Sequence, residues 1–185
     1  MSGATTEDYR GLWVFVEQRD GQPARVSLEL LSAGRVLADK LGVEVTALLI
    51  GDGIAEIAQE LISYGADRVI VAEDPVAKEY RTEVHAGIFV EQALSGKPEI
   101  VLIGATCFGR DLAPRIAARL RTGCTADCSE LKKVGRSAAK FYREALPEQS
   151  ALQTASTSIA HASLSMKGHI HQSYGHEYHH YSDLR

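Results

Sequence analysis

This sequence of 185 residues contains few cysteines, and we find in it neither a signal-like segment nor a long apolar run. The three cysteines, Cys107, Cys124 and Cys128, are an odd number without a disulfide pattern, which is typical of a reducing, cytoplasmic compartment. The first residues do not read as a secretory signal, because no charged segment is followed by an apolar one. Since the longest apolar runs have the length of strands, we expect no membrane-spanning segment.

Two common nucleotide-binding motifs are also absent. Residues 17–21, which follow the first predicted strand, contain no G-x-G-x-x-G sequence, and this argues against a dinucleotide-dependent dehydrogenase. No G-x-x-x-x-G-K-[ST] sequence occurs, which excludes P-loop phosphoryl transfer. The net charge of -4 gives no reason to expect binding to nucleic acid or to an anionic membrane.

What the sequence does contain is a regular alternation of apolar runs and helical periodicity. Strands are predicted at 13–16, 43–50, 68–72 and 100–104, and helices at 27–41, 54–62, 82–94 and from a loop at 106–111 to residue 120. Gly42, Gly65 and Gly96 are placed to end the first three helices, and Pro114 is expected in the first turn of the fourth. Strands that alternate with helices predict an α/β fold with a doubly wound, mostly parallel, Rossmann-like sheet.

The composition changes after residue 131. Residues 1–131 contain 13 Lys and Arg against 20 Asp and Glu, whereas residues 132–185 contain 7 against 4 and hold six of the seven histidines. Periodicity is lost over the same stretch, so we expect an α/β domain at 1–131 and an irregular, partly disordered tail at 132–185. Our hypothesis is that this tail is a truncated or frame-altered remainder, which comparison of the other two reading frames would test.

The candidate functional segment is the predicted loop after the fourth strand. It contains Gly104, Thr106, Gly109, Arg110 and Asp111. Open α/β sheets bind ligands at the carboxyl ends of their strands, glycines permit close backbone approach, and a helix N-terminus attracts anions. The alternative interpretation is an ordinary strand–helix turn in which Asp111 caps the helix.

Other polar side chains follow this segment. Arg110, Arg115, Arg119 and Arg121 are predicted on one helix, where they would pair with phosphates or a partner protein, or form a solvated face. Cys124 and Cys128 have a spacing seen in some zinc sites, but the remaining ligands would have to come from the histidines of the tail.

The sequence does not predict a complete enzymatic site either. Cys107 lies at a helix start that would stabilise a thiolate, yet no His–Asp pair is placed to serve it. We therefore predict neither a catalytic residue nor a metal ligand. A cysteine or zinc enzyme would have to retain metal after dialysis or show rapid alkylation of Cys107.

Several segments together resemble the alpha subunit of electron transfer flavoproteins. They are residues 13–21 (WVFVEQRDG), 26–31 (VSLELL), 61–67 (LISYGAD) and 98–106 (PEIVLIGAT), followed by 109–120 (GRDLAPRIAARL) and 122–128 (TGCTADC). The resemblance covers about residues 11–131. Residues 17–21 are also similar to members from anaerobes that take electrons from NADH and can bifurcate them.

The resemblance implies an adenine nucleotide alpha hydrolase-like fold and a heterodimer with a beta subunit. Such a heterodimer carries electrons between acyl-CoA dehydrogenase-type flavoenzymes and another carrier. The family's N-terminal domain packs against the beta subunit, a C-terminal domain holds FAD, and AMP or a second FAD is expected in the beta subunit. After Cys128 this sequence departs from the family pattern, and we expect the FAD domain to be missing.

We therefore expect an electron carrier subunit without a self-sufficient catalytic site, binding neither nucleic acid nor membrane. The segment facing the beta subunit or its nucleotide would contain Gly104, Thr106, Gly109, Arg110 and Asp111, and second in rank Arg115, Arg119, Thr125 and Asp127. The alternative is an adenine-nucleotide-binding α/β module of the stress-protein kind, with the same glycines facing a phosphate.

Overall fold

The structure, a computed structural model, describes residues 9–128, 130–133, 139–142, 159–163 and 181–184, with side chains described for 9–124. The helices are α1 (Arg25–Leu41), α2 (Ala58–Ser63), α3 (Thr82–Gly96) and α4 (Cys107–Leu120), and short 3-10 turns occur at η2 (Ala55–Ile57) and η3 (Pro75–Ala77). The strands are β1 (Leu12–Val16), β2 (Gln18–Arg19), β3 (Gln22–Pro23), β4 (Val45–Gly51), β5 (Arg68–Glu73), β6 (Ile100–Gly104), β7 (Thr125–Cys128), β8 (Glu130–Lys133), β9 (Ala139–Tyr142), β10 (Ile159–Ser163) and β11 (Tyr181–Leu184).

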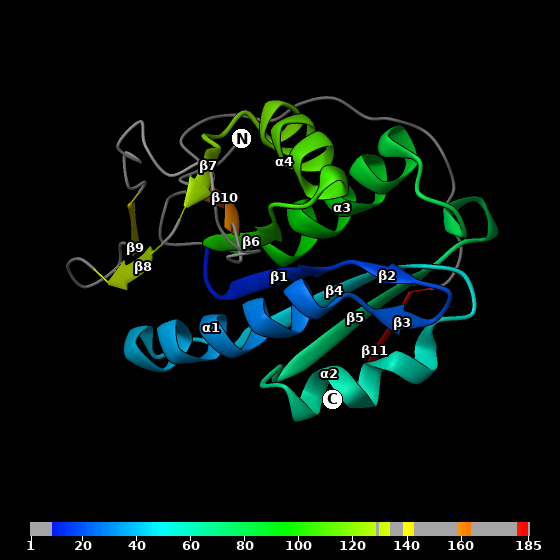
Figure 1. Cartoon of the computed structure of the whole chain (residues 1–185), viewed down its shortest axis with the longest axis horizontal. Helices are drawn as coiled ribbons and strands as arrows, with labels where there is room; N and C mark the ends of the chain where they lie inside the picture. Colours follow the sequence, from blue (N-terminus) through cyan, green and yellow to red (C-terminus); the bar gives the residue numbers. More distant parts are fainter. Residues whose placement is uncertain (1–8, 129, 134–138, 143–158, 164–180, 185) are drawn as a thin grey trace, which may run out of the picture.

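One mixed sheet has the order β11-β5-β4-β1-β6-β10-β7. Its four central strands are parallel, with Val14 of β1 opposite both Ala47 of β4 and Leu102 of β6. Helices α1 and α2 cover one face of the sheet, and α3 and α4 cover the other (Figure 1). The predicted doubly wound α/β fold is therefore confirmed. Its strand order reverses between β1 and β6, which makes that pair the topological switch point.

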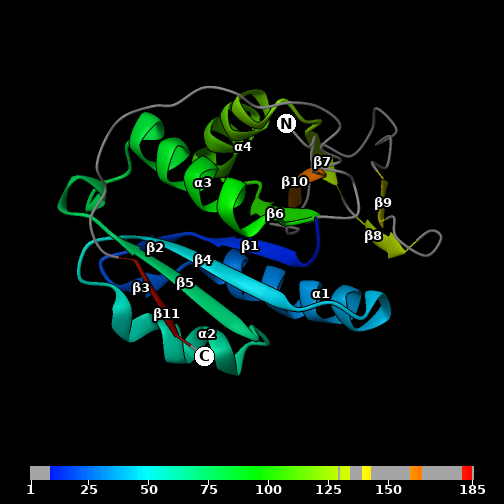
Figure 2. The same cartoon turned by 180° about the vertical axis from the view of Figure 1, so that it is seen from behind.

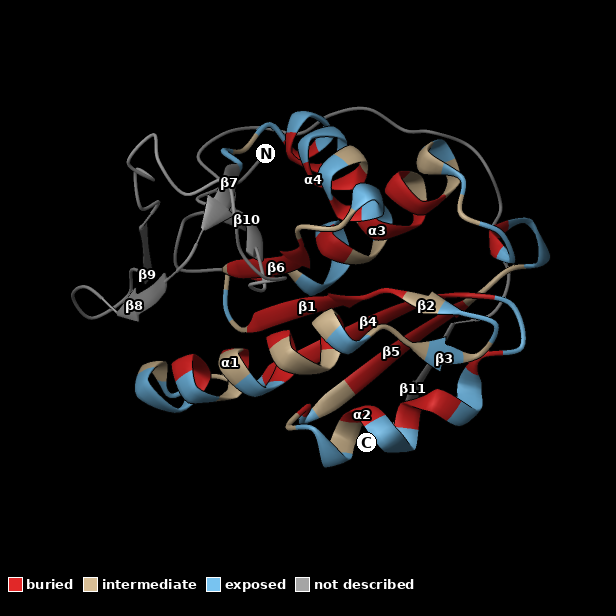
Figure 3. Ribbon diagram, in the orientation of Figure 1, coloured by how far each residue is buried: buried red, intermediate tan, exposed pale blue. Residues whose placement is uncertain are grey.

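Side chains of β1 alternate between the two layers of the core. Trp13 and Phe15 pack toward α3, where the ring of Phe89 meets both of them edge-on at centroid distances of 6.5 and 6.2 Å. Leu12 and Val14 face the opposite layer, which α1 and α2 cover. Because both faces of the central strands are buried (Figure 3), these strands are mostly apolar rather than alternating, apart from Thr46 in β4 and the terminal Arg68 and Glu73 of β5.

Helix ends agree with the sequence in two cases of three. Gly42 and Gly65 adopt the left-handed conformation expected after a helix, with φ of 69° and 109°. Gly96 does not: it is the last residue of α3, and the left-handed position is Lys97, with φ of 47°. The prediction for Gly96 was therefore wrong by one residue, because the helix continues until the chain turns back toward β6.

Helix α4 begins earlier than the sequence indicated. The segment 106–111 was predicted as a loop, but Thr106 caps the helix and Cys107 is its first residue. As a consequence Pro114 lies inside α4 at its eighth position and not in the first turn. Arg121, expected on the same helix as Arg110, is the C-cap in a left-handed conformation, with φ of 53°.

The C-terminal part contributes short strands. Strand β10 lies antiparallel beside β6 and β7, and β11 lies antiparallel beside β5, seen from behind in Figure 2. Strands β8 and β9 form a separate pair. The irregular tail predicted at 132–185 falls mostly on residues outside those the structure describes. No helix in the described ranges combines the length and apolar character that crossing a bilayer requires.

Candidate functional site

The candidate site lies where the carboxyl ends of β1 and β6 meet. Glu17 directly follows the last residue of β1, and Thr106 stands two residues after the end of β6. The hairpin β2–β3 and the start of α4 border the same edge (Figure 1). In open α/β sheets this position between reversing strands is where ligands bind.

A carboxylate–hydroxyl pair bridges the two strand ends. The hydroxyl of Thr106 lies 2.7 and 2.8 Å from the two carboxylate oxygens of Glu17 and donates its proton to them. The same oxygen of Thr106 accepts a hydrogen bond from the backbone N–H of Gly109 at 3.0 Å, which caps α4. The backbone N–H of Glu17 in turn donates to the hydroxyl of Ser27, a fully buried residue of α1, at 2.9 Å.

Glu17 is nearly removed from solvent, with 7% of its surface exposed. Burial raises the pKa of Glu17 above its ordinary value of 4.5, and the hydrogen bond from Thr106 opposes that rise. The sequence interpretation missed both Glu17 and Ser27. The available signal was a charged residue directly after a fully apolar strand, at the edge where functional groups gather.

Gly104 and Gly109, predicted to let a ligand approach, are both buried against protein atoms. A Cβ on Gly109 would lie 1.8 Å from the backbone oxygen of Gly104, so the start of α4 passes directly over the end of β6. A Cβ on Gly104 would lie 3.0 Å from a carboxylate oxygen of Glu17 and 3.1 Å from Val26. The two glycines therefore have a packing role, in which they make room for α4 and for the carboxylate of Glu17.

Asp111 connects α4 to the start of α3. Its carboxylate accepts hydrogen bonds from the hydroxyls of Thr82, at 2.5 Å, and Tyr80, at 3.1 Å, and from Arg115 Nε at 3.2 Å. The hydrogen bond from Thr82 is the main cause that holds the pKa of Asp111 below its ordinary value. Asp111 therefore does not cap α4, as the alternative interpretation had it, because Thr106 occupies that position.

The arginines of α4 pair within the domain. Arg115 and Arg119 both reach the carboxylate of Glu83 on α3, Arg115 at 3.2 Å. The exposed Arg110 donates from Nε to the backbone oxygen of Ala105 at 3.2 Å. Arg115 and Arg119 thus link α4 to Glu83 of α3, whereas Arg110 bonds to the residue just before its own helix.

The remaining candidates are more distant or only partly described. Thr125 and Asp127 lie on β7, where Thr125 is opposite His161 of β10, and their side chains fall outside the described part. Cys107 is exposed, and His85 of α3 is buried with its Nδ1 3.1 Å from the backbone oxygen of Arg81. Among described residues no group of three or more potential metal ligands occurs.

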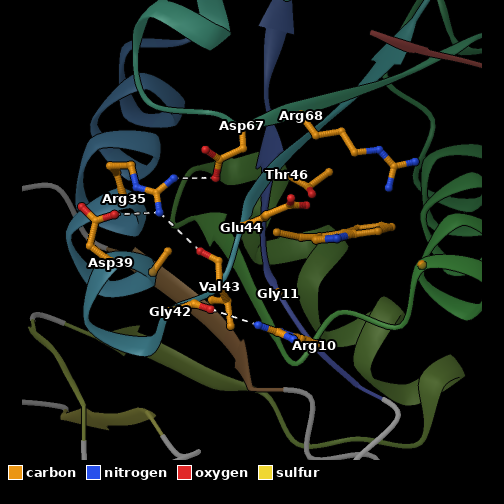
Figure 4. Close-up of a pocket in the computed structure, with 13 residues that line it drawn as sticks. Arg10, Gly11, Arg35, Asp39, Gly42, Val43, Glu44, Thr46, Asp67 and Arg68 are labelled. Carbon is orange, nitrogen blue, oxygen red and sulfur yellow. Dashed lines mark hydrogen bonds and ion pairs between the residues drawn. The ribbon is translucent and has the colours of Figure 1, made fainter. Parts of the chain in front are cut away.

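A second feature lies at the opposite, amino edge of the sheet. There a groove of about 720 Å³ is lined by residues of α1 and by residues at or before the starts of β1, β4 and β5, including several charged ones (Figure 4). Arg35 pairs with Asp67 at 2.5 Å and with Asp39 at 2.8 Å, and Asp67 also accepts the backbone N–H of Val45 at 2.8 Å. The lining as a whole contains three arginines and three acidic residues, so the groove presents no strong preference for a ligand of one charge.

The fold and the carboxyl edge together define the class. The chain is a doubly wound α/β domain whose switch-point position is filled by its own side chains. The hydroxyl of Thr106 and the carboxylate of Glu17 bond to each other there, and the same hydroxyl caps α4. Comparison with known proteins identifies the family: residues 12–158 match the electron transfer flavoprotein domain, and the chain belongs to that family.

Relatives match the same part of the chain. It is 51% identical over 124 residues to the electron transfer flavoprotein subunit alpha of Clostridium acetobutylicum. The aligned stretch covers 67% of this chain and 37% of the relative. It is 48% identical over 131 residues to the acryloyl-CoA reductase electron transfer subunit beta of Anaerotignum propionicum, with 71% and 36% covered. It is 45% identical over 124 residues to the lactate dehydrogenase (NAD(+),ferredoxin) subunit LctC of Acetobacterium woodii, with 67% and 30% covered. The chain thus spans between 30% and 37% of the length of these relatives, and the predicted resemblance is confirmed.

Proposed function

We propose that this chain is the N-terminal part of the alpha subunit of an electron transfer flavoprotein and docks with a beta subunit. Assembled, the heterodimer carries electrons between flavin dehydrogenases of the acyl-CoA dehydrogenase type and another carrier. The observation that carries the proposal is the family match over residues 12–158, together with 51% identity to a subunit of that name. In this assignment the chain itself is a carrier subunit and not an enzyme.

The internal contacts of the carboxyl edge support a docking role over a catalytic one. Glu17, Thr106 and Asp111 each bond to the protein itself, and they fix the first turns of α4 against β1 and α3. Such contacts hold the surface rigid. Of the side chains exposed on the first turn of α4, which include Cys107, we assign Phe108 and Arg110 to contact with the beta subunit.

FAD would be held by other parts of the heterodimer. The described carboxyl edge does not fit the pyrophosphate of a dinucleotide, because the carboxylate of Glu17 lies at the switch point and the two nearby glycines are packed against protein atoms. We place the flavin that transfers electrons in a region homologous to the two thirds of the relatives that this chain does not span, and AMP or a second FAD in the beta subunit.

The most specific part of the proposal is that the heterodimer takes electrons from NADH and bifurcates them. It is supported by 45% identity to a subunit of a lactate dehydrogenase whose name includes both NAD(+) and ferredoxin. The acryloyl-CoA reductase relative, at 48% identity, supports a partner that acts on acyl-CoA compounds.

Co-expression with a tagged beta subunit of an electron transfer flavoprotein tests the docking role. We expect this chain to co-purify with the beta subunit in equal amounts, and to show no flavin absorbance when purified alone. If the two chains do not co-purify from cells in which both are present and folded, the proposed docking role is contradicted. Stoichiometric flavin on the isolated chain would contradict the placement of FAD.

The alternative, an adenine-nucleotide-binding module of the stress-protein kind, stays a prediction from the sequence. The carboxylate of Glu17 beside the α4 N-terminus argues against it, since a buried negative charge at that point opposes a phosphate. Calorimetry with ATP and AMP distinguishes the two, because micromolar binding by the isolated chain would favour the module.

A further inference from the structure

The switch point between β1 and β6 has the features of an anion site, yet a side chain of the domain fills it. In doubly wound folds the crevice beside reversing strands receives the ligand, and the N-terminus of the following helix receives its phosphate. Here α4, a helix of 14 residues, begins at that crevice immediately after β6. The group that lies between its cap and the end of β1 is the carboxylate of Glu17.

We propose that Glu17 is the resident anion of the switch-point crevice and thereby the residue that excludes nucleotide phosphates from this domain. The proposal does not depend on docking with a beta subunit. It assigns a specificity role to a side chain that the predicted site does not contain.

Three observations place the carboxylate in the position of a bound anion. Both of its oxygens lie within hydrogen-bond distance of the hydroxyl of Thr106, the N-cap of α4. Its residue is 7% exposed, so the charge is enclosed rather than solvated. Burial raises the pKa of Glu17 above its ordinary value, whereas the hydrogen bond from Thr106 and the partial positive charge of the helix N-terminus favour the ionised form.

The backbone is shaped around this carboxylate. Gly104 leaves the space that one oxygen of Glu17 occupies, since a Cβ there would lie 3.0 Å from it. The backbone of Glu17 is held from the other side by the hydroxyl of Ser27. A phosphate entering the crevice would therefore meet both occupied space and a like charge, and it could bind only after Glu17 moved away.

Chemical rescue tests the proposal. In Glu17→Ala the carboxylate is removed while Thr106 and the α4 N-terminus stay, so a small free carboxylate can take its place. We expect the thermal midpoint of Glu17→Ala to rise saturably with sodium acetate relative to sodium chloride at equal ionic strength. If the variant is unfolded in chloride, the same titration follows the recovery of helical circular dichroism. Absence of any acetate effect would overturn the proposal.

Two controls locate the effect at the crevice. Glu17→Ala combined with Thr106→Val loses the hydroxyl donor, and we expect it to lose the acetate response, whereas Glu17→Ala with Thr106→Ser should keep it. An equal response in the valine variant would overturn the assignment. In the unmodified chain, inorganic phosphate and AMP should leave the thermal midpoint at its chloride value, and a saturable rise with either would overturn the exclusion role.

Discussion

The two edges of the same sheet differ in how they handle charge. At the carboxyl edge a single carboxylate, that of Glu17, is buried and bonded to the hydroxyl of Thr106. At the amino edge Arg35 forms ion pairs with Asp39 and Asp67 beside an open groove of about 720 Å³. The charge at the carboxyl edge is buried and hydrogen-bonded. The charges at the amino edge line an open groove, where solvent screens them.

The comparison shows that the open groove is not the better functional candidate. The groove lies where strands begin, and Arg35 pairs there with Asp39 and Asp67 at partly exposed positions. The carboxyl edge lies at the switch point, where the fold concentrates helix N-termini and strand ends. Topology and burial therefore carry more weight than volume.

The largest effect is expected at Gly109. In Gly109→Ala the new Cβ would lie 1.8 Å from the backbone oxygen of Gly104, so α4 must move away from β6. We expect a loss of about 3 kcal/mol in the free energy of unfolding, measured by urea denaturation. Gly123→Ala is the control, because a Cβ there meets nothing within 4 Å, and it should change stability by less than about 0.5 kcal/mol. Equal effects in the two variants would contradict the close approach of α4.

Local pattern predicted the elements of this domain well and its site poorly. The fourth strand was predicted at its observed bounds, Ile100–Gly104, because a continuous apolar run is a local property of the sequence. Glu17 became part of the site only through Ser27 and Thr106, which are 10 and 89 residues away. No periodicity in the sequence reports such contacts.

The position of Asp111 shows the same limit at shorter range. An acidic residue near a predicted helix start is a reasonable cap, yet Thr106 stands earlier in the chain with an extended backbone, φ -78° and ψ 177°, and takes that position. Asp111 is then free to bond to Tyr80 and Thr82, which the tertiary fold brings beside it. Sequence could identify the segment, but the fold decided what each residue in it does.

The second effect concerns docking at the carboxyl edge. Phe108 is 45% exposed on the first turn of α4 and packs on the ring of Tyr80 at a centroid distance of 4.7 Å, so it is a rigid aromatic contact. We expect Phe108→Ala to weaken binding of the beta subunit about tenfold in a titration calorimeter, a loss of about 1.4 kcal/mol. Leu94→Ala removes a similarly exposed side chain, 39%, near the other end of α3 and should leave affinity unchanged. The reverse ranking would move the interface away from the carboxyl edge.

The third effect tests the amino edge. Asp67 accepts hydrogen bonds from both Arg35 and the backbone N–H of Val45, and its side chain is 43% exposed. Asp67→Asn should cost about 1 kcal/mol in the free energy of unfolding. The reason is that Arg35 and the backbone N–H of the buried Val45 both lose their charged acceptor. Asp39→Asn, at 66% exposure in an i,i+4 pair, should cost about 0.3 kcal/mol. Losses of similar size, compared by urea denaturation, would show that the groove is uniformly screened.

The smallest effect separates two buried groups by the sign of their pH dependence. Burial raises the pKa of Glu17 above 4.5, so the folded chain binds its proton more tightly, and stability due to this group falls as pH rises from 4.5 through the folded pKa. Burial lowers the pKa of His85 below 6.5, with a backbone hydrogen bond to Arg81 opposing, so its contribution is lost as pH falls from 6.5 through the folded pKa.

Urea midpoints measured across this range in Glu17→Gln and His85→Gln distinguish the two contributions. Subtracting the profile of Glu17→Gln from that of the unmodified chain should leave a difference that declines with rising pH above 4.5, whereas the His85→Gln difference should decline with falling pH below 6.5. A flat difference for Glu17→Gln would mean that its carboxyl group has the same proton affinity folded and unfolded. Glu17 would then lack, in solution, the burial that distinguishes the carboxyl edge from the amino edge.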